Sequence, residues 1–281
     1  MRVALCQTEI AYEKKEVNFI KAGRMIESAV AQGAELVLLP EMSFTGYSMN
    51  TGVTKEKAED SPTIHLMQGY AQNYRTAIGF GWVSAPENEE EADANAMMGT
   101  AALDAAKCQN HYTVIGADGT ILADYVKIHP FSPKGEDIAF RGGTKIERFE
   151  LGGITFGLSV CYDLRFPELY SELTRKAEVV IVAANWPKAR AEHWKILMKA
   201  RALETQSYFL GVNCVGTQGT DEYEGDSMVV NPDGHVMIEK ANEEIILIAD
   251  IPATVLEQRL TFPVRSDRRD DLYTRWYWEH S

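Results

Sequence analysis

Several features that mark common protein classes are missing from this sequence of 281 residues. No stretch of about eighteen apolar residues occurs, so no membrane-spanning helix is predicted. Residues 1–7 read as an apolar strand and lack the long apolar region of a secretory leader, and we therefore expect a cytoplasmic protein. Neither a Gly-x-Gly-x-x-Gly segment nor a P-loop is present, which argues against a nucleotide-binding domain.

Cysteine is scarce, and its spacing excludes two further classes. The four cysteines are Cys6, Cys108, Cys161 and Cys214. They form no Cys-x-x-Cys pair, so the sequence predicts neither a disulfide framework nor a cysteine zinc site. The histidines show no metal-ligand spacing, and we expect no metal and no other cofactor. Cys6 and Cys214 lie in apolar runs and are predicted core residues, whereas the surroundings of Cys108 predict no role.

Basic residues are too few to balance the acidic ones. Lys and Arg number 28 against 41 Asp and Glu, which gives a formal net charge of −13. Nucleic-acid binding requires basic patches that contact phosphates, so that class is disfavoured. An anionic substrate would need local cations to overcome the acidic field.

What is present is a regular alternation of strand-like and helix-like segments. Apolar, β-branched runs predict strands at 3–6, 36–39, 77–83, 112–115, 154–160, 179–183, 209–212, 227–230 and 245–248. Helical spacing predicts helices at 17–31, 64–73, 167–176, 192–205 and 254–260. The turns Asp118-Gly119 and Asp233-Gly234 each predict a hairpin, so the sheets cannot be purely parallel. The class is mixed α/β, and no linker divides residues 1–281, which we expect to form one domain.

Two segments depart from this alternation. Residues 87–110 join an acidic run to a small, polar stretch without periodicity, and we interpret them as a lid or an extra surface element. The tail, residues 261–281, carries Tyr273, Trp276 and Trp278 close to its end. Such aromatic side chains need a surface to cover, which predicts contact with the same domain or with a second subunit.

Cys161 is the first candidate for chemistry. It follows the apolar run 157–160 and precedes Tyr162-Asp163-Leu164-Arg165-Phe166-Pro167, so it lies on a turn between a predicted strand and a predicted helix. Backbone N–H groups and a helix N-terminus at such a turn would favour a thiolate and an oxyanion. On this segment alone, a buried and unreactive cysteine is the alternative.

Two other ionisable residues also end strand-like runs. Glu41 follows the apolar run 36–39, and Lys127 lies between two apolar residues. Separately, each has an ordinary interpretation, as a helix-capping or surface acid and as a solvated edge-strand lysine. Together with Cys161, they offer the base, the oxyanion stabiliser and the nucleophile that acyl transfer requires.

The segments around these residues resemble a known family. Leu38-Leu39-Pro40-Glu41, Tyr125-Val126-Lys127-Ile128-His129 and Val160-Cys161-Tyr162-Asp163-Leu164-Arg165-Phe166-Pro167-Glu168 are similar to the three signature segments of the nitrilase superfamily of carbon-nitrogen hydrolases. Further segments follow in the expected order over nearly the whole chain, and Asn185-Trp186-Pro187 is most similar to the omega-amidase branch. The resemblance implies a four-layer α-β-β-α sandwich and a homodimer or higher homo-oligomer, and the aromatic residues of the 261–281 tail lead us to expect that tail at the interface.

The same resemblance implies a role for each residue. Cys161 would attack an amide carbon, Glu41 would act as base, and Lys127 with the backbone N–H of Tyr162 would stabilise the oxyanion. Glu136 matches the second glutamate of the family and would position the amide nitrogen, the alternative being an ordinary loop acid. Because a carboxylate is a weak base toward a thiol, we expect Lys127 and the turn amides to lower the pKa of Cys161.

His129 is a second candidate base, because it lies two residues from Lys127 on the same face of an extended segment. Its Ile-His-Pro context favours a structural hydrogen bond instead. His193 is expected to pack or to cap the start of a helix.

Residues that follow strand ends are expected to line the substrate pocket, namely Phe44, Tyr47, Asn185 and Trp186. The cations nearby are Arg165, Lys188 and Arg190. One that faces the pocket would bind the distal carboxylate of a small amide such as 2-oxoglutaramate; the alternative for each is a surface or ion-paired residue. The predicted reaction releases ammonia and a carboxylate through a thioester. A nitrilase or an N-carbamoyl amidohydrolase is the alternative enzyme, and a non-catalytic scaffold is the alternative from another class.

Overall fold

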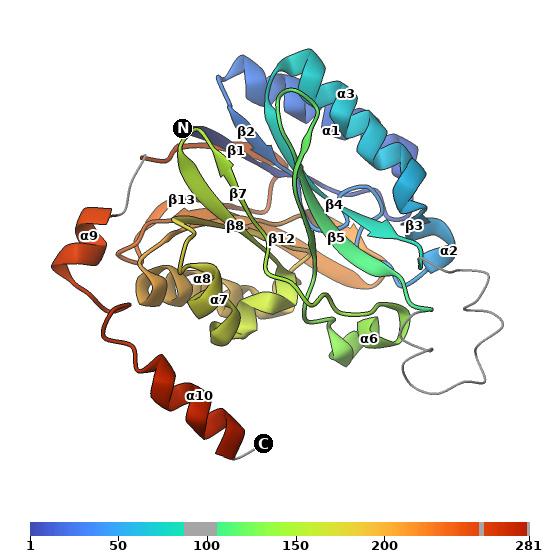
Figure 1. Ribbon diagram of the computed structural model, residues 1–281. Helices are drawn as coiled ribbons and strands as arrows, with labels where there is room; N and C mark the ends of the chain where they lie inside the picture. Colours follow the sequence, from blue (N-terminus) through green and yellow to red (C-terminus); the bar gives the residue numbers. More distant parts are fainter. Residues whose placement is uncertain (87–105, 253–255, 280–281) are drawn as a thin grey trace.

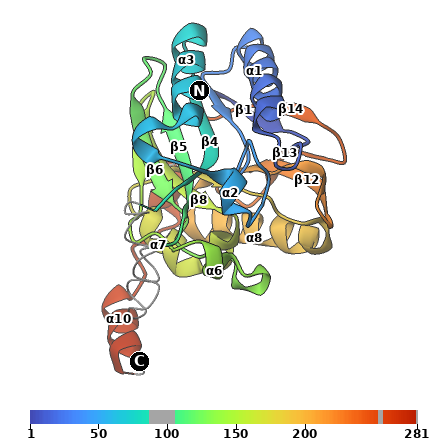
Figure 2. The same cartoon turned by 90° about the vertical axis from the view of Figure 1, so that its right-hand side faces the viewer.

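The computed structural model describes residues 1–281 except 87–105, 253–255 and 280–281. The described residues form two seven-stranded sheets that lie face to face, and helices cover the outer face of each sheet (Figures 1 and 2). The layers follow one another as helix, sheet, sheet and helix. This order confirms the predicted four-layer α-β-β-α sandwich.

The first sheet joins the N-terminal half of the chain to one strand from near its end. Its order is β14 (Ile245–Asp250), β1 (Arg2–Gln7), β2 (Leu36–Leu38), β4 (Ala77–Ser84), β5 (Gln109–Ile115) and β6 (Ile121–Val126), with β3 (Lys55–Glu56) paired to β4. β1, β2 and β4 are parallel, and β14 and β5 pair antiparallel with them. The hairpin β5–β6 turns at Gly119, which has a φ of +86° that favours glycine, as the Asp-Gly pair predicted.

The second sheet is built in the same way from the C-terminal half. Its order is β11 (Val215–Gln218), β12 (Asp221–Val230), β10 (Tyr208–Val212), β9 (Val179–Ala183), β8 (Ile154–Val160) and β7 (Arg148–Leu151), with β13 (Val236–Ala241) paired to β12. The central strands β8, β9 and β10 are parallel, and the outer pairs are antiparallel. The second predicted hairpin joins β12 to β13.

Helices flank both sheets. Their bounds are α1 (Lys15–Ala31), α2 (Thr51–Thr54), α3 (Pro62–Tyr74), α6 (Glu136–Ala139), α7 (Pro167–Leu173), α8 (Ala191–Thr205), α9 (Leu256–Thr261) and α10 (Asp270–Glu279). α1 and α3 pack on the first sheet with Ile26 and Met67 among their buried residues. α7 and α8 pack on the second sheet, where Tyr170, Trp194 and Met198 are buried.

The core follows from strand periodicity. In β1, Val3 and Leu5 belong to the cluster between the sheets, whereas Ala4 and Cys6 belong to the cluster under α1 and α3. β9 is buried along its whole length, because a central parallel strand is covered on both faces. Cys6 and Cys214 are fully buried, which confirms their prediction as core residues.

Some segments differ from the sequence prediction. The tail contains a ten-residue helix, α10, and the strands β3, β7 and β11 were not predicted. Most of the proposed lid, and the predicted start of the helix at residue 254, lie outside the described residues. In the described part of the chain, no helix has both the length and the apolar character needed to cross a bilayer.

Candidate active site

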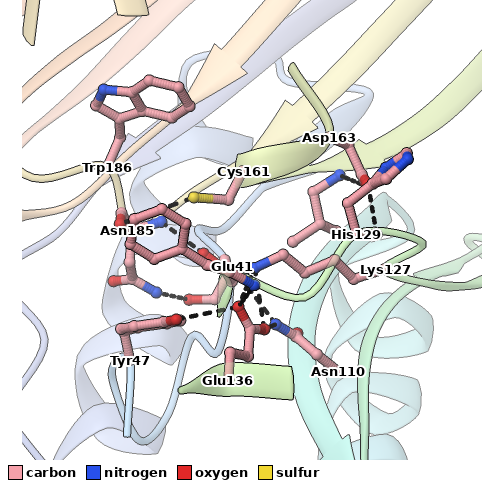
Figure 3. Close-up of polar contacts among 12 residues, drawn as sticks. Glu41, Tyr47, Asn110, Lys127, His129, Glu136, Cys161, Asp163, Asn185 and Trp186 are labelled. Carbon is pink, nitrogen blue, oxygen red and sulfur yellow. Dashed lines mark hydrogen bonds and ion pairs between the residues drawn. The ribbon is translucent and has the colours of Figure 1, made fainter. Parts of the chain in front are cut away.

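Three side chains from the ends of different strands meet in one place. Glu41 lies three residues beyond β2, Lys127 directly follows β6, and Cys161 directly follows β8. Figure 3 shows these side chains pointing toward one another. The structure therefore brings together the three residues that the sequence placed at strand ends.

A buried ammonium lies between two carboxylates. Lys127 Nζ is 2.9 Å from Glu41 Oε1, and 2.7 and 3.0 Å from the two carboxylate oxygens of Glu136. The side chains of all three residues are at most 1% exposed. Because a single charge is costly to bury, the ammonium and the two carboxylates offset part of one another's desolvation cost.

The protonation of Lys127 follows from these neighbours. Burial alone lowers the pKa of Lys127, but the charges of Glu136 and Glu41 more than offset that effect, and the pKa lies above its usual range. Burial, followed by the charge of Glu136, raises the pKa of Tyr47 as well. The Tyr47 hydroxyl therefore stays protonated and donates to Glu136 Oε2 at 3.0 Å.

The loop before α6 delivers Glu136. Gly135 has a φ of +74°, which glycine adopts without strain, and Glu136 follows as the first residue of α6. Its Oε2 also accepts the N–H of Phe131 at 2.7 Å. The loop therefore closes on its own carboxylate and holds it beside Lys127.

Glu41 is held on both carboxylate oxygens. Oε1 accepts from Lys127 and from Asn110 Nδ2 at 2.8 Å, and Oε2 accepts the N–H of Asn185 at 2.9 Å. The chain after β2 also lies tightly against β4, because residue 81 is glycine: an added Cβ there would lie 2.3 Å from the nitrogen of Met42. The Glu41 carboxylate is thus held in one orientation by the protein alone.

Cys161 has an unusual backbone conformation. Its φ is +47°, in the left-handed region, which costs a non-glycine residue roughly 1–2 kcal/mol. It opens a 3₁₀ turn, Cys161–Arg165, and α7 begins only at Pro167, so the turn and not an α-helix N-terminus directly follows the thiol. Asp163 supports the turn by accepting the N–H of Val160 at 3.0 Å.

The predicted lowering of the thiol pKa is wrong for this site. Burial, and then the charge of Glu41, raise the pKa of Cys161 well above its usual value, although Lys127 lowers it. The reason is that two carboxylates already balance the lysine. The Cys161 thiol is therefore expected to carry its proton in the absence of a substrate.

The pocket beside the thiol is lined largely by aromatic and basic side chains. Its lining residues are Tyr47, Phe131, Lys134, Cys161, Tyr162, Arg165, Asn185, Trp186, Pro187, Arg190 and Asp221. Of the four residues expected to line it, Tyr47, Asn185 and Trp186 do so, and Phe44 does not. Phe44 is 2% exposed and packs against Phe19 and Phe80 under α1, because the chain after Glu41 turns back toward that helix.

Asn185 connects the base with the pocket wall. Its Nδ2 donates to the main-chain oxygen of Glu41 at 2.6 Å, and its Oδ1 accepts from Gln218 at 2.9 Å and from the Cys214 thiol. Its main-chain oxygen lies 3.9 Å from the Cys161 sulfur. Both polar atoms of the Asn185 side chain therefore already bind protein groups. The side chain holds the Glu41 segment in place and leaves little hydrogen-bonding capacity for a substrate.

The cations near the pocket differ in how far they are neutralised. Lys188 pairs with Glu222 at 3.4 Å, and Lys134 pairs with Asp221. Arg165 stacks over the Trp186 ring at 4.9 Å and contacts His193 Nδ1 at 3.1 Å. Arg190 lies over the Phe131 ring at 5.3 Å. Among the described residues, neither arginine pairs with a carboxylate.

His129 has a structural role. Its Nδ1 is 2.7 Å from Asp163 Oδ1, and its ring stacks on Phe166 with centroids 3.7 Å apart. The ring is thereby held against the turn, as the structural alternative predicted. His193 contacts Arg165 at the start of α8.

The sequence did not reveal two residues of this network. Asn110 bridges Glu41 and Glu136, and Gln218 binds both Asn185 and the N–H of Tyr47, the latter at 2.7 Å. Counting back from the Asp118-Gly119 turn would have placed Asn110 beside Lys127. Gln218 lies on the edge strand β11, which the sequence did not predict because it has no apolar pattern.

Within the described ranges, no three His, Cys, Asp or Glu side chains gather so that they could hold a metal ion.

A family model described as carbon-nitrogen hydrolase matches residues 2–259. The chain therefore belongs to the carbon-nitrogen hydrolase family, in agreement with the resemblance of its motifs.

Named relatives and solved structures cover nearly the whole chain. The 2-oxoglutaramate amidase of Bacillus subtilis (strain 168) is 30% identical over 96% of this chain and 98% of its own length. XC1258 from Xanthomonas campestris, a CN-hydrolase superfamily protein with an arsenic adduct in its active site, superposes with a TM-score of 0.84 at 27% identity, covering 95% and 97% of the two chains.

A mutant of the Nesterenkonia sp. AN1 amidase is also similar. It has a TM-score of 0.81 and 26% identity, covering 98% of this chain and 99% of its own. Its structure shows the result of Michael addition of acrylamide at the active-site cysteine.

Proposed function

We propose that this protein is an omega-amidase that hydrolyses the terminal amide of a small dicarboxylic acid monoamide, such as 2-oxoglutaramate. The observation that carries the proposal is the placement of Glu41, Lys127 and Cys161 at one end of the sheets, beside a pocket with two arginines that pair with no carboxylate of the described residues. The B. subtilis relative supports the choice of substrate.

The first half of the reaction forms a thioester. The Cys161 sulfur attacks the amide carbon while its proton passes to Glu41, and the carbonyl electron pair moves onto oxygen. The oxyanion accepts hydrogen bonds from Lys127 Nζ and from the N–H of Tyr162. As the tetrahedral intermediate collapses, the C–N bond breaks, and the proton on Glu41 passes to the leaving nitrogen, which departs as ammonia.

The second half restores the thiol. Glu41, again a carboxylate, takes a proton from water as the water oxygen attacks the thioester carbon. The same donors stabilise the second oxyanion. The C–S bond then breaks, the sulfur regains the proton from Glu41, and the carboxylic acid product releases its own proton to solvent water and leaves as a carboxylate. Glu136 holds Lys127, and we propose that it also positions the amide nitrogen.

The two pocket arginines fit a substrate that carries a second carboxylate. Each guanidinium stacks on an aromatic ring of the pocket wall, which leaves N–H groups at its edge for an anion. Their charge also counters the protein's negative field, which would otherwise repel such a substrate. We therefore assign the distal carboxylate to Arg190 and Arg165.

Ammonia release from a panel of substrates tests the proposal. We expect 2-oxoglutaramate to be hydrolysed with a kcat/KM at least about 100-fold above that of a simple nitrile or an N-carbamoyl amino acid. Cys161→Ser should lower kcat by at least about 1,000-fold. A preference for the nitrile or carbamoyl compound would favour the alternative enzymes. Turnover that survives in Cys161→Ser would contradict the thioester, and no turnover of any compound would favour a scaffold.

We extend the proposal to the location and the oligomeric state of the protein. Its four free cysteines include the nucleophile, which must stay reduced, and a cytoplasmic location provides that condition. We further propose that residues 1–281 form one domain that pairs as a homodimer through the 261–281 tail. The support is α10, which projects from the body (Figures 1 and 2) with Trp276 and Trp278 at 47% and 82% exposure.

A further inference from the structure

The two carboxylates of the site share a second nitrogen besides that of the lysine. Asn110, on β5, donates from Nδ2 to Glu41 Oε1 at 2.8 Å and to Glu136 Oε1 at 3.1 Å. The same two oxygens accept from Lys127 Nζ at 2.9 and 3.0 Å. Oxygen and nitrogen atoms thus alternate around a closed ring, with a cation on one side and a neutral amide on the other (Figure 3).

The carboxamide of Asn110 can be oriented in only one way. The residue is 2% exposed, and within the described part of the chain its Oδ1 has no hydrogen-bond partner. The reverse orientation would turn this oxygen toward two carboxylate oxygens, acceptor against acceptor. The side chain thus leaves one acceptor unsatisfied, a cost in itself, in order to donate to both carboxylates.

Lys127 alone would hold the two carboxylates unequally. Glu136 contacts Nζ through both of its oxygens, whereas Glu41 does so through Oε1 alone. A second donor on that oxygen corrects the imbalance, while the N–H of Asn185 fixes Oε2. We propose that Asn110 is a positioning residue, whose carboxamide keeps the Glu41 carboxylate oriented toward Cys161 while Lys127 stays bound to Glu136. This inference rests on the proposed function, because it assumes that Glu41 is the base.

The main chain of Asn110 has a separate task that substitutions leave in place. Its carbonyl oxygen accepts the N–H of Lys127 at 2.9 Å and so fixes the start of the lysine segment. Side-chain variants at this position therefore report on the carboxamide. Asn18 provides a matched control, because it is 3% exposed and its amide binds Ala11 and Phe44 under α1, outside the site.

The first test removes the donor. Asn110→Leu is expected to lower kcat by about 10- to 100-fold, the usual effect of losing a hydrogen bond to a charged group. KM should change by less than about threefold, because Asn110 touches the base and not the substrate. Asn18→Leu should lower the melting temperature without changing kcat per folded molecule. A kcat within twofold of wild type in folded Asn110→Leu overturns the inference.

The second test changes the charge and distinguishes positioning from packing. Asn110→Asp adds a third carboxylate beside Glu41 and Glu136, and it should abolish turnover at pH 8. Part of the activity should return, relative to wild type, as the pH falls toward about 5, because a protonated carboxyl can again donate one hydrogen bond. Asn18→Asp should keep the wild-type pH profile. An unchanged profile in Asn110→Asp would also overturn the inference.

Two choices keep this inference separable from the proposed substrate. Turnover is measured with whichever amide of the panel the wild-type enzyme hydrolyses fastest, so failure on 2-oxoglutaramate leaves both tests intact. Alkylation of Cys161 by iodoacetamide needs no substrate. Since the charges of Glu41 and Glu136 both raise the pKa of the thiol, the added charge in Asn110→Asp should slow alkylation at pH 8 by at least about threefold. An alkylation rate equal to that of Asn18→Asp contradicts the placement of Asn110 in the cluster.

Discussion

The carboxylate of Asp163 binds both the main-chain N–H of His129, at 3.0 Å, and its ring Nδ1, at 2.7 Å. His129 lies two residues after Lys127, and Asp163 lies two residues after Cys161. One buried carboxylate therefore joins the segment that contains Lys127 to the turn that begins at Cys161. Its other oxygen accepts from Tyr125 and from the N–H of Val160, so the link continues into the strands β6 and β8.

Asp163→Asn should weaken this link in both stability and catalysis. The amide would turn an N–H group toward donors that now face a carboxylate oxygen, and losing a charged acceptor costs about 1.5–3 kcal/mol of unfolding free energy. Urea unfolding followed by circular dichroism measures the loss, and ammonia release should show a lower kcat. Asp137→Asn is the control, because Asp137 is exposed and should change stability by less than about 0.5 kcal/mol. Equal stability of the two variants would contradict the role of Asp163.

Glu41→Gln should separate thiol acidity from catalysis. Burial and the charge of Glu41 raise the pKa of Cys161, so the thiolate fraction in wild type grows only as the pH rises above the usual thiol range near about 8.5. Removing the Glu41 charge lowers the thiol pKa, and each unit of decrease speeds iodoacetamide alkylation at pH 8 by up to about tenfold. Amide hydrolysis should nevertheless fall by at least about 1,000-fold, because the base is gone.

The matched control for this experiment is Glu56→Gln. Glu56 is a buried acid that pairs with Lys15 at 2.8 Å, away from the thiol, so its loss should leave the alkylation rate of Cys161 unchanged. If Glu41→Gln slows alkylation, the carboxylate is not raising the pKa of the thiol, and the proton transfer assigned to it is wrong.

The proposed catalytic side chains could be picked out of the sequence because of their position at strand ends. Glu41 and Cys161 follow strands that are almost entirely buried, and such strands are central in a sheet, so the residues after them lie at its end. The pKa of the thiol could not be predicted in the same way. The sequence shows that a lysine exists, but it does not show that two carboxylates already neutralise it or that water is excluded.

Two other residues near the site, Phe44 and Asn110, could not be placed correctly from the sequence. Phe44 was expected in the pocket, but Met42 and Gly46 have φ angles of +42° and +72°, and this reversal turns the segment toward α1. Asn110 was missed because no apolar pattern or motif marks it, although the register of the β5–β6 hairpin pairs it with Lys127. The turn thus predicted the hairpin and its register, but not that a side chain on it would bridge two carboxylates.

Arg190→Met should reveal whether the pocket selects a distal carboxylate. We expect the KM for 2-oxoglutaramate to rise about 10- to 100-fold and the KM for the uncharged propionamide to stay within twofold. The reason is that only 2-oxoglutaramate carries a carboxylate that the Arg190 guanidinium can bind. Lys188→Met is the control, since the Lys188 ammonium already pairs with Glu222 and should affect neither substrate. If Arg190→Met and Lys188→Met behave alike, while Arg165→Met produces the selective change, the carboxylate belongs to Arg165 alone.

Removal of the residues beyond Asp271 should convert the proposed dimer into a monomer. The deleted segment contains Trp276 and Trp278, which are too exposed to stabilise an isolated subunit strongly, so their contribution must come from a surface they cover in the assembly. Sedimentation should show the mass falling by half and the melting temperature dropping with it. Ile121→Ser, at an exposed apolar position on β6, should leave both quantities unchanged. A wild-type monomer, or a truncated protein of unaltered mass and melting temperature, would show that the tail does not form the interface.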